Sequence, residues 1–142
     1  MLYIVDSSVF NKLYLEEPGS EQARHLFTRA QQREVRLLAP DLLRLEVLNT
    51  AQRAGVAVDK IAELIDRLTP LIEIRPVTDD EYRKAIEIMQ QGHDKSGYPS
   101  IYDSLFHAMA FCNDGVLVTA DRRHLVKTET LGKVTKLADL MA

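Results

Sequence analysis

The chain begins with an apolar run that leads directly into an acid, in the stretch MLYIVDSSVF. Residues 2–5 show no polar alternation, which is typical of a strand buried on both faces of a parallel sheet. Such a sheet needs helices over both faces, so this run limits the chain to a narrow set of folds. Asp6 ends the run, and an unpaired buried carboxylate is costly, so Asp6 must have a partner.

The rest of the chain alternates between expected strands and expected helices. Expected strands cover residues 2–5, 35–38, 71–74, 116–118 and the neighbourhood of Val134. Expected helices cover residues 9–15, 21–31, a segment opened by Asp41, 58–68, 79–91, 101–112 and a terminal turn. Strands that alternate with helices predict an α/β fold with a parallel sheet that is covered on both faces.

Polar residues mark several expected helix starts and one loop. Ser20 and Asp41 are expected N-caps, and Thr78 with Glu81 has the pattern of a capping box. The segment QGHDKSGYPS, residues 91–100, is the most polar and turn-rich part of the chain and is expected to be a loop. The segment IYDSLFHAMAFC follows it, and its nearly continuous apolar surface predicts a central buried helix.

Composition places the chain among ordinary globular proteins. Its 142 residues suit one domain, residues 1–142, and 46% of them are hydrophobic and 27% charged. The lone cysteine, Cys112, excludes an internal disulfide and a CxxC zinc site and fits a reducing cytoplasm. No basic leader and no run near the ~20 apolar residues of a membrane span is visible, so a cytoplasmic protein without a membrane anchor is expected. The net charge of −3 gives no general attraction for nucleic acid, although a local basic patch can supply one.

Three further acids share the apolar surroundings of Asp6. Glu46 lies inside LLRLEVLNTA, Asp103 lies near the start of IYDSLFHAMAFC, and Asp121 follows the strand in VLVTAD. In an open parallel sheet, ligands bind beyond the carboxyl ends of the strands, where Asp6 and Asp121 both lie. The helices that carry Glu46 and Asp103 can reach the same edge, so the four acids are expected to converge.

Four converging carboxylates repel one another strongly without a cation. At ~6 Å and an effective dielectric of ~20, each like-charge pair costs about 3 kcal/mol. Protonation of one or two acids relieves this repulsion, and a divalent cation relieves it better. Oxygen ligands completed by water suit Mg²⁺ or Mn²⁺, and such ions typically also meet a phosphate. The sequence therefore predicts metal-assisted phosphodiester hydrolysis.

Each acid taken alone also has a simpler explanation. Asp6, Asp103 and Asp121 have the positions of helix caps or turn residues. Glu46 is near enough along the chain to pair with Arg44 or Arg53. The arrangement of all four acids, and not any single position, supports a metal site.

Four motifs in this order resemble those of PIN-domain nucleases, in particular the VapC-like toxins of bacterial toxin–antitoxin pairs. They are IVDSSV, LLRLEVLN, IYDSLFHAMA and LVTAD, and they span essentially the whole chain. The resemblance implies a three-layer α/β/α sandwich around a mainly parallel sheet, a Mg²⁺ or Mn²⁺ site, and cleavage of RNA. It also implies a homodimer and a tight protein inhibitor, the antitoxin. Transfer RNA is a frequent target class of such toxins.

The resemblance also assigns roles to single residues. Four positions match the acidic quartet of the family: Asp6, Glu46, Asp103 and Asp121. Thr119 matches a frequent hydroxyl that supports the metal site, and Ser7 stands where the family usually has Thr or Ser. One departure is the loop at residues 91–100, which is longer and more polar than the short link of many relatives. It leaves the rim of the site and the substrate fit open.

Several polar residues near the four acids are candidates for supporting the site or contacting RNA. Asn49 lies three residues after Glu46 on the same helical face, and Ser104 directly follows Asp103. Basic residues after Asp121 and in the loop are candidates for binding flanking phosphates, namely Arg122, Arg123, Lys127 and Lys95. Such charges usually form only a solvated face, which is the simpler explanation.

The four histidines show no metal-ligand spacing. His107 lies four residues after Asp103 and is expected to be a core histidine satisfied by hydrogen bonds. His25, His93 and His124 are expected on the surface.

Other functions compete with the metal-dependent ribonuclease. A catalytically inactive PIN-like RNA-binding or scaffold domain keeps the fold, although the presence of all four acids argues against it. A receiver-like domain needs an adjacent acidic pair at the first strand and a lysine at a late strand end, which are not seen. A haloacid-dehalogenase-type phosphatase needs a second Asp two residues after Asp6, where Ser8 stands. Within the family, a housekeeping nuclease is the alternative to a toxin.

Overall fold

The computed structural model describes residues 1–92 and 94–140. In this part of the chain, five strands form one sheet in the order β3-β2-β1-β4-β5. The strands are β1 (Leu2–Val5), β2 (Arg36–Pro40), β3 (Ile72–Arg75), β4 (Val116–Thr119) and β5 (Val134–Lys136). Every neighbouring pair is parallel, and Ile4 in the central strand lies between Leu38 and Leu117. The predicted parallel α/β fold is therefore confirmed.

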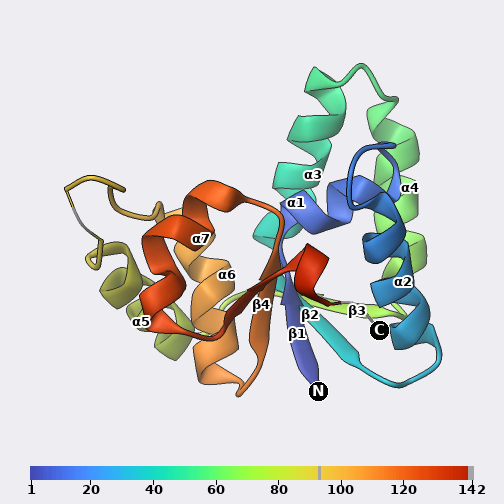
Figure 1. The fold of residues 1–142 in the computed structure, drawn as a ribbon. Helices are drawn as coiled ribbons and strands as arrows, with labels where there is room; N and C mark the ends of the chain where they lie inside the picture. Colours follow the sequence, from blue (N-terminus) through green and yellow to red (C-terminus); the bar gives the residue numbers. More distant parts are fainter. Residues whose placement is uncertain (93, 141–142) are drawn as a thin grey trace.

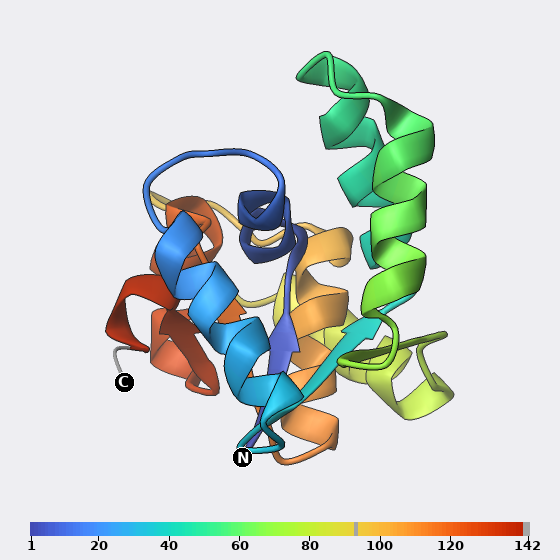
Figure 2. The same ribbon diagram turned by 90° about the vertical axis from the view of Figure 1, so that its right-hand side faces the viewer.

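Helices cover both faces of this sheet (Figures 1 and 2). The α-helices are α1 (Ser7–Phe10), α2 (Ser20–Gln31), α3 (Leu42–Arg53), α4 (Val58–Leu68), α5 (Asp79–Met89), α6 (Ile101–Cys112) and α7 (Arg122–Thr128). Short 3₁₀ turns are η1 (Asn11–Leu13), η2 (Glu129–Leu131) and η3 (Leu137–Asp139). One face carries α2, the other carries α6 with α5 packed against it, and the α3–α4 hairpin projects beyond the carboxyl ends of the strands.

The core forms where the apolar run at the start of the chain meets both helical layers. Ile4 and Val5 are fully buried, and Phe10 packs edge-to-face on Phe27 of α2, with ring centroids 6.0 Å apart. Residues 106–110 of α6 are all buried, which confirms the central buried helix. No helix in the described ranges is long and apolar enough to cross a bilayer.

Three of the expected helix starts have different outcomes. The capping box of Thr78 and Glu81 is present, so that prediction is confirmed. Asp41 occupies the N-cap position of α3 but makes no side-chain cap bond. The prediction for Ser20 is wrong, because Gly19 is the N-cap of α2 at a φ of 95°. The Ser20 hydroxyl is used elsewhere, since it donates to the Leu15 carbonyl at 2.9 Å.

The described residues of the segment 91–100 contain no helix, as expected: residues 94–96 form a turn and Gly97 forms a single bridge. Its last residue, Ser100, begins α6 as a side-chain N-cap. His93 lies outside the described residues. The segment thus leads the chain from the outer helix α5 to the start of α6, at the same end of the sheet where β1 and β4 finish.

Candidate active site

Asp6 lies at the carboxyl end of the central strand and is held by hydroxyl and amide groups. Its Oδ1 accepts hydrogen bonds from the Val9 amide, at 3.3 Å, and from the Ser8 hydroxyl. The Ser8 hydroxyl also accepts from the Ala120 amide at 2.9 Å and lies 3.5 Å from Thr119 Oγ1. Asp6 is therefore both the N-cap of α1 and part of a bonded connection between the ends of β1 and β4.

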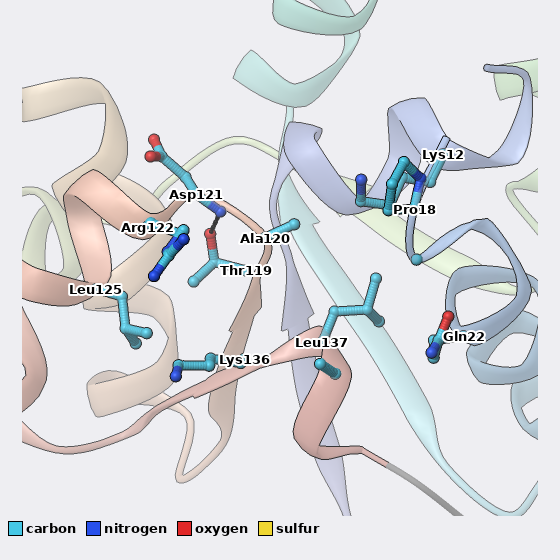
Figure 3. Close-up of a pocket in the computed structure, with 12 residues that line it drawn as sticks. Lys12, Pro18, Gln22, Thr119, Ala120, Asp121, Arg122, Leu125, Lys136 and Leu137 are labelled. Atoms are coloured by element: carbon cyan, nitrogen blue, oxygen red, sulfur yellow. Dashed lines mark hydrogen bonds between the residues drawn. The ribbon is translucent and has the colours of Figure 1, made fainter. Parts of the chain in front are cut away.

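Thr119 extends this connection to Asp121. The Asp121 amide donates to Thr119 Oγ1 at 2.9 Å (Figure 3). Asp121 Oδ1 accepts from the Arg123 amide at 2.9 Å and so caps α7. The cap explanations for Asp6 and Asp121 are thus correct, and both acids nevertheless lie together at the carboxyl ends of β1 and β4. The expected supporting hydroxyl, Thr119, lies beside both acids, and it contacts each of them.

Glu46 reaches the same edge from α3. Its Oε1 accepts a hydrogen bond from the Ser7 hydroxyl at 3.1 Å, so α3 is joined to the first turn after β1. The alternative ion pairs of Glu46 do not form, because Arg44 pairs with Asp66 at 3.2 Å and Arg53 contacts Thr50. Ser7 therefore supports Glu46.

Asp103 lies in the first turn of α6, where the Ser100 hydroxyl accepts from its amide at 3.0 Å. Ser100 is the N-cap, so the Asp103 carboxylate is not used for capping. The negative charge of Asp103 raises the pKa of Asp6 and the pKa of Glu46. The negative charge of Asp121 in turn raises the pKa of Asp103. The four predicted acids thus form one electrostatically coupled group, referred to below as the acidic cluster.

Burial makes the acidic cluster reluctant to ionise completely. Burial raises the pKa of Asp6 to about 6, against the opposing hydrogen bonds of Ser8, Thr119 and Val9. Burial likewise raises the pKa of Glu46 to about 7, and the charges of Asp103 and Asp6 add to the rise. The pKa of Asp103 is also raised, first by burial and then by the charge of Asp121. A bound cation would remove this penalty.

The donor chemistry of the acidic cluster fits a hard divalent cation. All four side chains offer carboxylate oxygens, which Mg²⁺ and Mn²⁺ prefer. Within residues 1–92 and 94–140, no three His, Cys, Asp or Glu side chains are gathered closely enough to hold one ion together. Mg²⁺ keeps several waters and is commonly bound by one or two carboxylates plus a substrate phosphate, so this spacing is compatible with a partly hydrated ion.

The residues predicted to support the acids or to contact RNA differ in exposure and in their contacts. Arg122 and Arg123 are exposed beside Asp121, and the charges of Arg123 and Lys127 oppose the rise in the Asp103 pKa. Ser104 is fully buried, so it is not a contact for RNA, and its hydroxyl has no hydrogen-bond partner in the described part of the chain. Asn49 is exposed and makes no hydrogen bond to Glu46 among the described residues.

Two histidines form a buried pair between α6 and α7. His107 Nε2 is bonded to the Gly132 carbonyl oxygen at 2.8 Å, and His107 Nδ1 lies 3.2 Å from His124 Nε2. The expectation for His107 as a bonded core residue is confirmed, and His25 is exposed as expected. The surface prediction for His124 is wrong, because α7 turns this side chain onto α6. Burial lowers the pKa of both buried imidazoles to about 4, so they are neutral at pH 7.

Sequence reasoning missed Ser8 and a pocket next to the acidic cluster. Ser8 was visible only as the second residue after Asp6, a position whose hydroxyl can reach back to the capping carboxylate. The pocket has a volume of about 480 Å³ and includes Thr119 and Asp121 in its lining, with Lys12 and Lys136 (Figure 3). Lys136 ends β5, so its position at the carboxyl edge of the sheet was the available signal.

The model of the PIN domain family matches residues 3–129, which include all four acids. The chain belongs to the PIN domain family. A comparison of the sequence with curated proteins gives no match. The family assignment therefore rests on the family model and on the fold.

Solved structures share this PIN fold at low sequence identity. One is VapBC2 from Rickettsia felis, bound to a DNA fragment from the VapBC2 promoter. A chain of that structure superimposes on this chain with a TM-score of 0.71 at 13% sequence identity, and the match covers 96% of this chain and 98% of the VapBC2 chain. A toxin–antitoxin complex from Klebsiella pneumoniae gives a TM-score of 0.66 at 12% sequence identity, and the match covers 95% of this chain and 97% of the chain in that complex. The sarcin–ricin loop cleaving toxin VapC20 from Mycobacterium tuberculosis gives a TM-score of 0.61 at 16% sequence identity, and the match covers 79% of this chain and 83% of the VapC20 chain.

Proposed function

We propose that this PIN domain is a Mg²⁺- or Mn²⁺-dependent endoribonuclease and the toxin of a toxin–antitoxin pair. The main support is the acidic cluster, in which β1, β4, α3 and α6 each bring one carboxylate to the same edge of the sheet. A protein that needed these acids only as helix caps would not need Glu46 or Asp103 there. We treat residues 1–142 as one domain, because one sheet includes strands from residue 2 to residue 136.

In this proposal, Asp6, Asp103 and Asp121 bind the cation, some of them through water molecules of its hydration shell, and Glu46 lies beside them. When bound, the cation supplies positive charge to a phosphate oxygen and makes a water molecule more acidic. Ser8 and Thr119 hold the Asp6 carboxylate in place through hydrogen bonds. Glu46 has a pKa of about 7, which suits a group that takes a proton from the attacking water near neutral pH. Attack by water, rather than by the ribose 2′-hydroxyl, leaves a 3′-hydroxyl and a 5′-phosphate.

The structural relatives support a protein antitoxin as the partner. The Klebsiella pneumoniae relative is a toxin–antitoxin complex, and the fold of this chain follows it over nearly its full length. An arginine of the antitoxin matches paired carboxylate oxygens and would compete with the cation for the acidic cluster. We further propose a cytoplasmic homodimer that acts on single-stranded RNA loops, with transfer RNA as a candidate substrate.

One observation favours a second candidate, a PIN domain that binds RNA or serves as a scaffold without cleaving. The carboxylates are not gathered in a group of three close enough for one ion in the described residues. This candidate keeps RNA or protein binding and predicts no metal-dependent cleavage. The two functions therefore differ in one measurable property.

Cleavage of RNA by the purified protein tests the proposal. Wild type and Asp6→Asn are incubated with total bacterial RNA and Mn²⁺ or with excess chelator, and new 5′-phosphate ends are sequenced. We expect new ends only for wild type with the metal. Absence of new ends under all conditions would favour the non-cleaving candidate, and equal cleavage by Asp6→Asn would rule out the acidic cluster as the catalytic site.

A further inference from the structure

The pocket next to the acidic cluster combines basic side chains with an apolar surface. Its volume of about 480 Å³ is within the range of small-ligand pockets, roughly 300–1,000 Å³. Arg122 of α7 and Lys136 of β5 lie on one side of Leu137, and Lys12 with Gln22 lies on the other (Figure 3). None of Asp6, Glu46 and Asp103 lines this pocket, which therefore differs from the acidic cluster while sharing Thr119 and Asp121 with it.

Lys12 is held in place on the side of the pocket away from Arg122 and Lys136 (Figure 3). Its side chain is only 12% exposed and its ammonium group pairs with Glu17 at 2.9 Å. A Cβ atom added at Gly19 would lie 3.1 Å from two carbons of the Lys12 side chain, so glycine allows this close approach. The pair of Lys12 and Glu17 is neutral overall, so the free positive charge of the pocket comes from elsewhere.

Arg122 and Lys136 supply that free charge. Both are exposed, and neither takes part in an ion pair or a side-chain hydrogen bond among the described residues. Asp121 is the acid on the rim, and its carboxylate points away from Lys136 and Leu137 (Figure 3). The apolar side chains of Leu125 and Leu137 line the space between the cations.

We propose that this pocket binds the nucleotide next to the cleaved phosphodiester of a single-stranded RNA, with the phosphate on Arg122 and Lys136. The sugar and base lie against Leu125 and Leu137. This inference rests on the proposed ribonuclease function. The pocket gives the ribonuclease a binding site for the strand beside the acidic cluster. The acidic cluster itself repels phosphates unless a cation is bound.

Charge complementarity selects a phosphate-bearing strand as the occupant, and the proposed ribonuclease function makes that strand RNA. The net charge of the chain is −3, so general attraction to a polyanion is absent and a local pair of cations has to capture the strand. Single-strand binding sites combine cations that track the phosphates with side chains that contact the bases, and here Leu125 and Leu137 provide an apolar surface beside the cations. The shared boundary at Thr119 and Asp121 places this nucleotide immediately beside the reacting phosphate.

RNA binding measured without metal tests the pocket separately from catalysis. Each substitution is made in an Asp6→Asn background with chelator present, and the probe is a short mixed-sequence single-stranded RNA followed by fluorescence anisotropy. Lys136→Glu is the test, with Lys136→Gln as a milder variant. Arg36→Glu is the matched control. Arg36 is also an exposed basic residue at a strand end, but it begins β2 and so lies at the amino ends of the strands, away from the pocket.

We expect Lys136→Glu to weaken RNA binding about tenfold at low salt and to reduce the slope of log K against log salt by about 0.7, the contribution of one phosphate contact. Arg36→Glu is expected to stay within about twofold of its parent. Equal affinities for the two charge reversals, or no measurable binding by the parent, would overturn the pocket assignment. Cleavage by wild type with Mn²⁺, measured in parallel, reports on the ribonuclease function independently of this result.

Discussion

Ser8 joins the Asp6 carboxylate to the end of the neighbouring strand. Its hydroxyl donates to Asp6 Oδ1 and accepts from the Ala120 amide at 2.9 Å. One small side chain therefore fixes an acid of the cluster relative to the segment that carries Thr119 and Asp121. The positions of two acids depend on this contact.

Replacement of Ser8 by Ala is expected to lower metal-dependent cleavage about tenfold. A hydrogen bond to a charged group contributes roughly 1.5–3 kcal/mol, and its loss lets Asp6 move and favours its protonated form. The measurement is kcat/KM at saturating Mn²⁺ near neutral pH. Ser8→Thr keeps the hydroxyl and is the control, so a loss of the same size in both variants would argue against the hydrogen bond as the cause.

Replacement of Asp6 by Asn is expected to stabilise the protein without metal by about 1–2 kcal/mol at pH 7. The raised pKa of Asp6 means that the folded state holds its proton more tightly than the unfolded state. Wild-type stability therefore falls as the pH rises from 3.8 to about 6 and is constant above that range. Asn removes this penalty and is itself a good N-cap.

Thermal unfolding in chelator measures this stabilisation, which corresponds to a rise of roughly 3–8 °C in Tm. The exposed Asp139→Asn serves as the control for a change in net charge. The difference between Asp6→Asn and wild type is expected to vanish below about pH 4, where Asp6 is protonated in both states. A variant less stable than wild type at pH 7 would contradict the burial penalty.

The rate of cleavage is expected to rise with pH through about pH 7 and to level off above it. Asp6, with a pKa of about 6, and Glu46, with a pKa of about 7, must both lose protons before they can bind the cation or accept a proton from water. A profile of kcat/KM against pH at fixed free Mn²⁺ measures this dependence. Glu46→Gln is expected to remove the upper part of the rise, and a flat wild-type profile between pH 5 and about 7 would be inconsistent with these pKa values.

The buried pair of Glu81 and Arg75 is expected to be essential for stability. Glu81 is 1% exposed and accepts two bonds of 2.8 Å from Arg75, and Asn113 at the end of α6 also donates to it. Burial raises the pKa of Glu81, but these bonds and the Thr78 amide outweigh it and hold the pKa at about 2. The stabilisation is present above pH 4.5 and is lost as the pH falls through about 2.

Glu81→Ala is expected to lower the free energy of unfolding by about 3 kcal/mol, because it removes both short carboxylate bonds of the half-buried Arg75 charge and leaves it the longer ion pair with Glu73, at 3.8 Å. This corresponds to a fall of roughly 10 °C in Tm. Asp80→Ala removes an exposed pair with Arg83 on the same helix and is expected to cost less than about 1 kcal/mol. Similar losses in both variants would show that the buried pair has no special role.

Local patterns in the sequence predict most of the fold. The apolar runs at residues 2–5 and 116–118 are strands, and the capping box at Thr78 marks the start of α5. The acids at the ends of β1 and β4 are predictable in the same way, because the carboxyl ends of parallel strands lie at one edge. Asp6 and Asp121 show that a residue can be a helix cap and a member of a site at once.

Contacts between distant segments explain what the sequence does not show. His124 is buried because α7 packs against α6, and no pattern within RRHLVK indicates that contact. Lys12, Arg122 and Lys136 come from three separate elements and meet only when the sheet and both helical layers are assembled. Ser20 has the composition of an N-cap, but the chain places Gly19 there because the turn requires a positive φ.

Binding of Mn²⁺ tests most directly whether the acidic cluster is a cation site. Free Mn²⁺ is measured by electron paramagnetic resonance during titration of wild type, Asp6→Asn, Asp103→Asn and the exposed control Asp139→Asn at neutral pH. We predict that wild type and Asp139→Asn bind with equal affinity and that the two cluster variants bind at least about tenfold more weakly, since each loses one charged ligand. Equal Mn²⁺ affinity in all four proteins would contradict a metal site formed by these carboxylates.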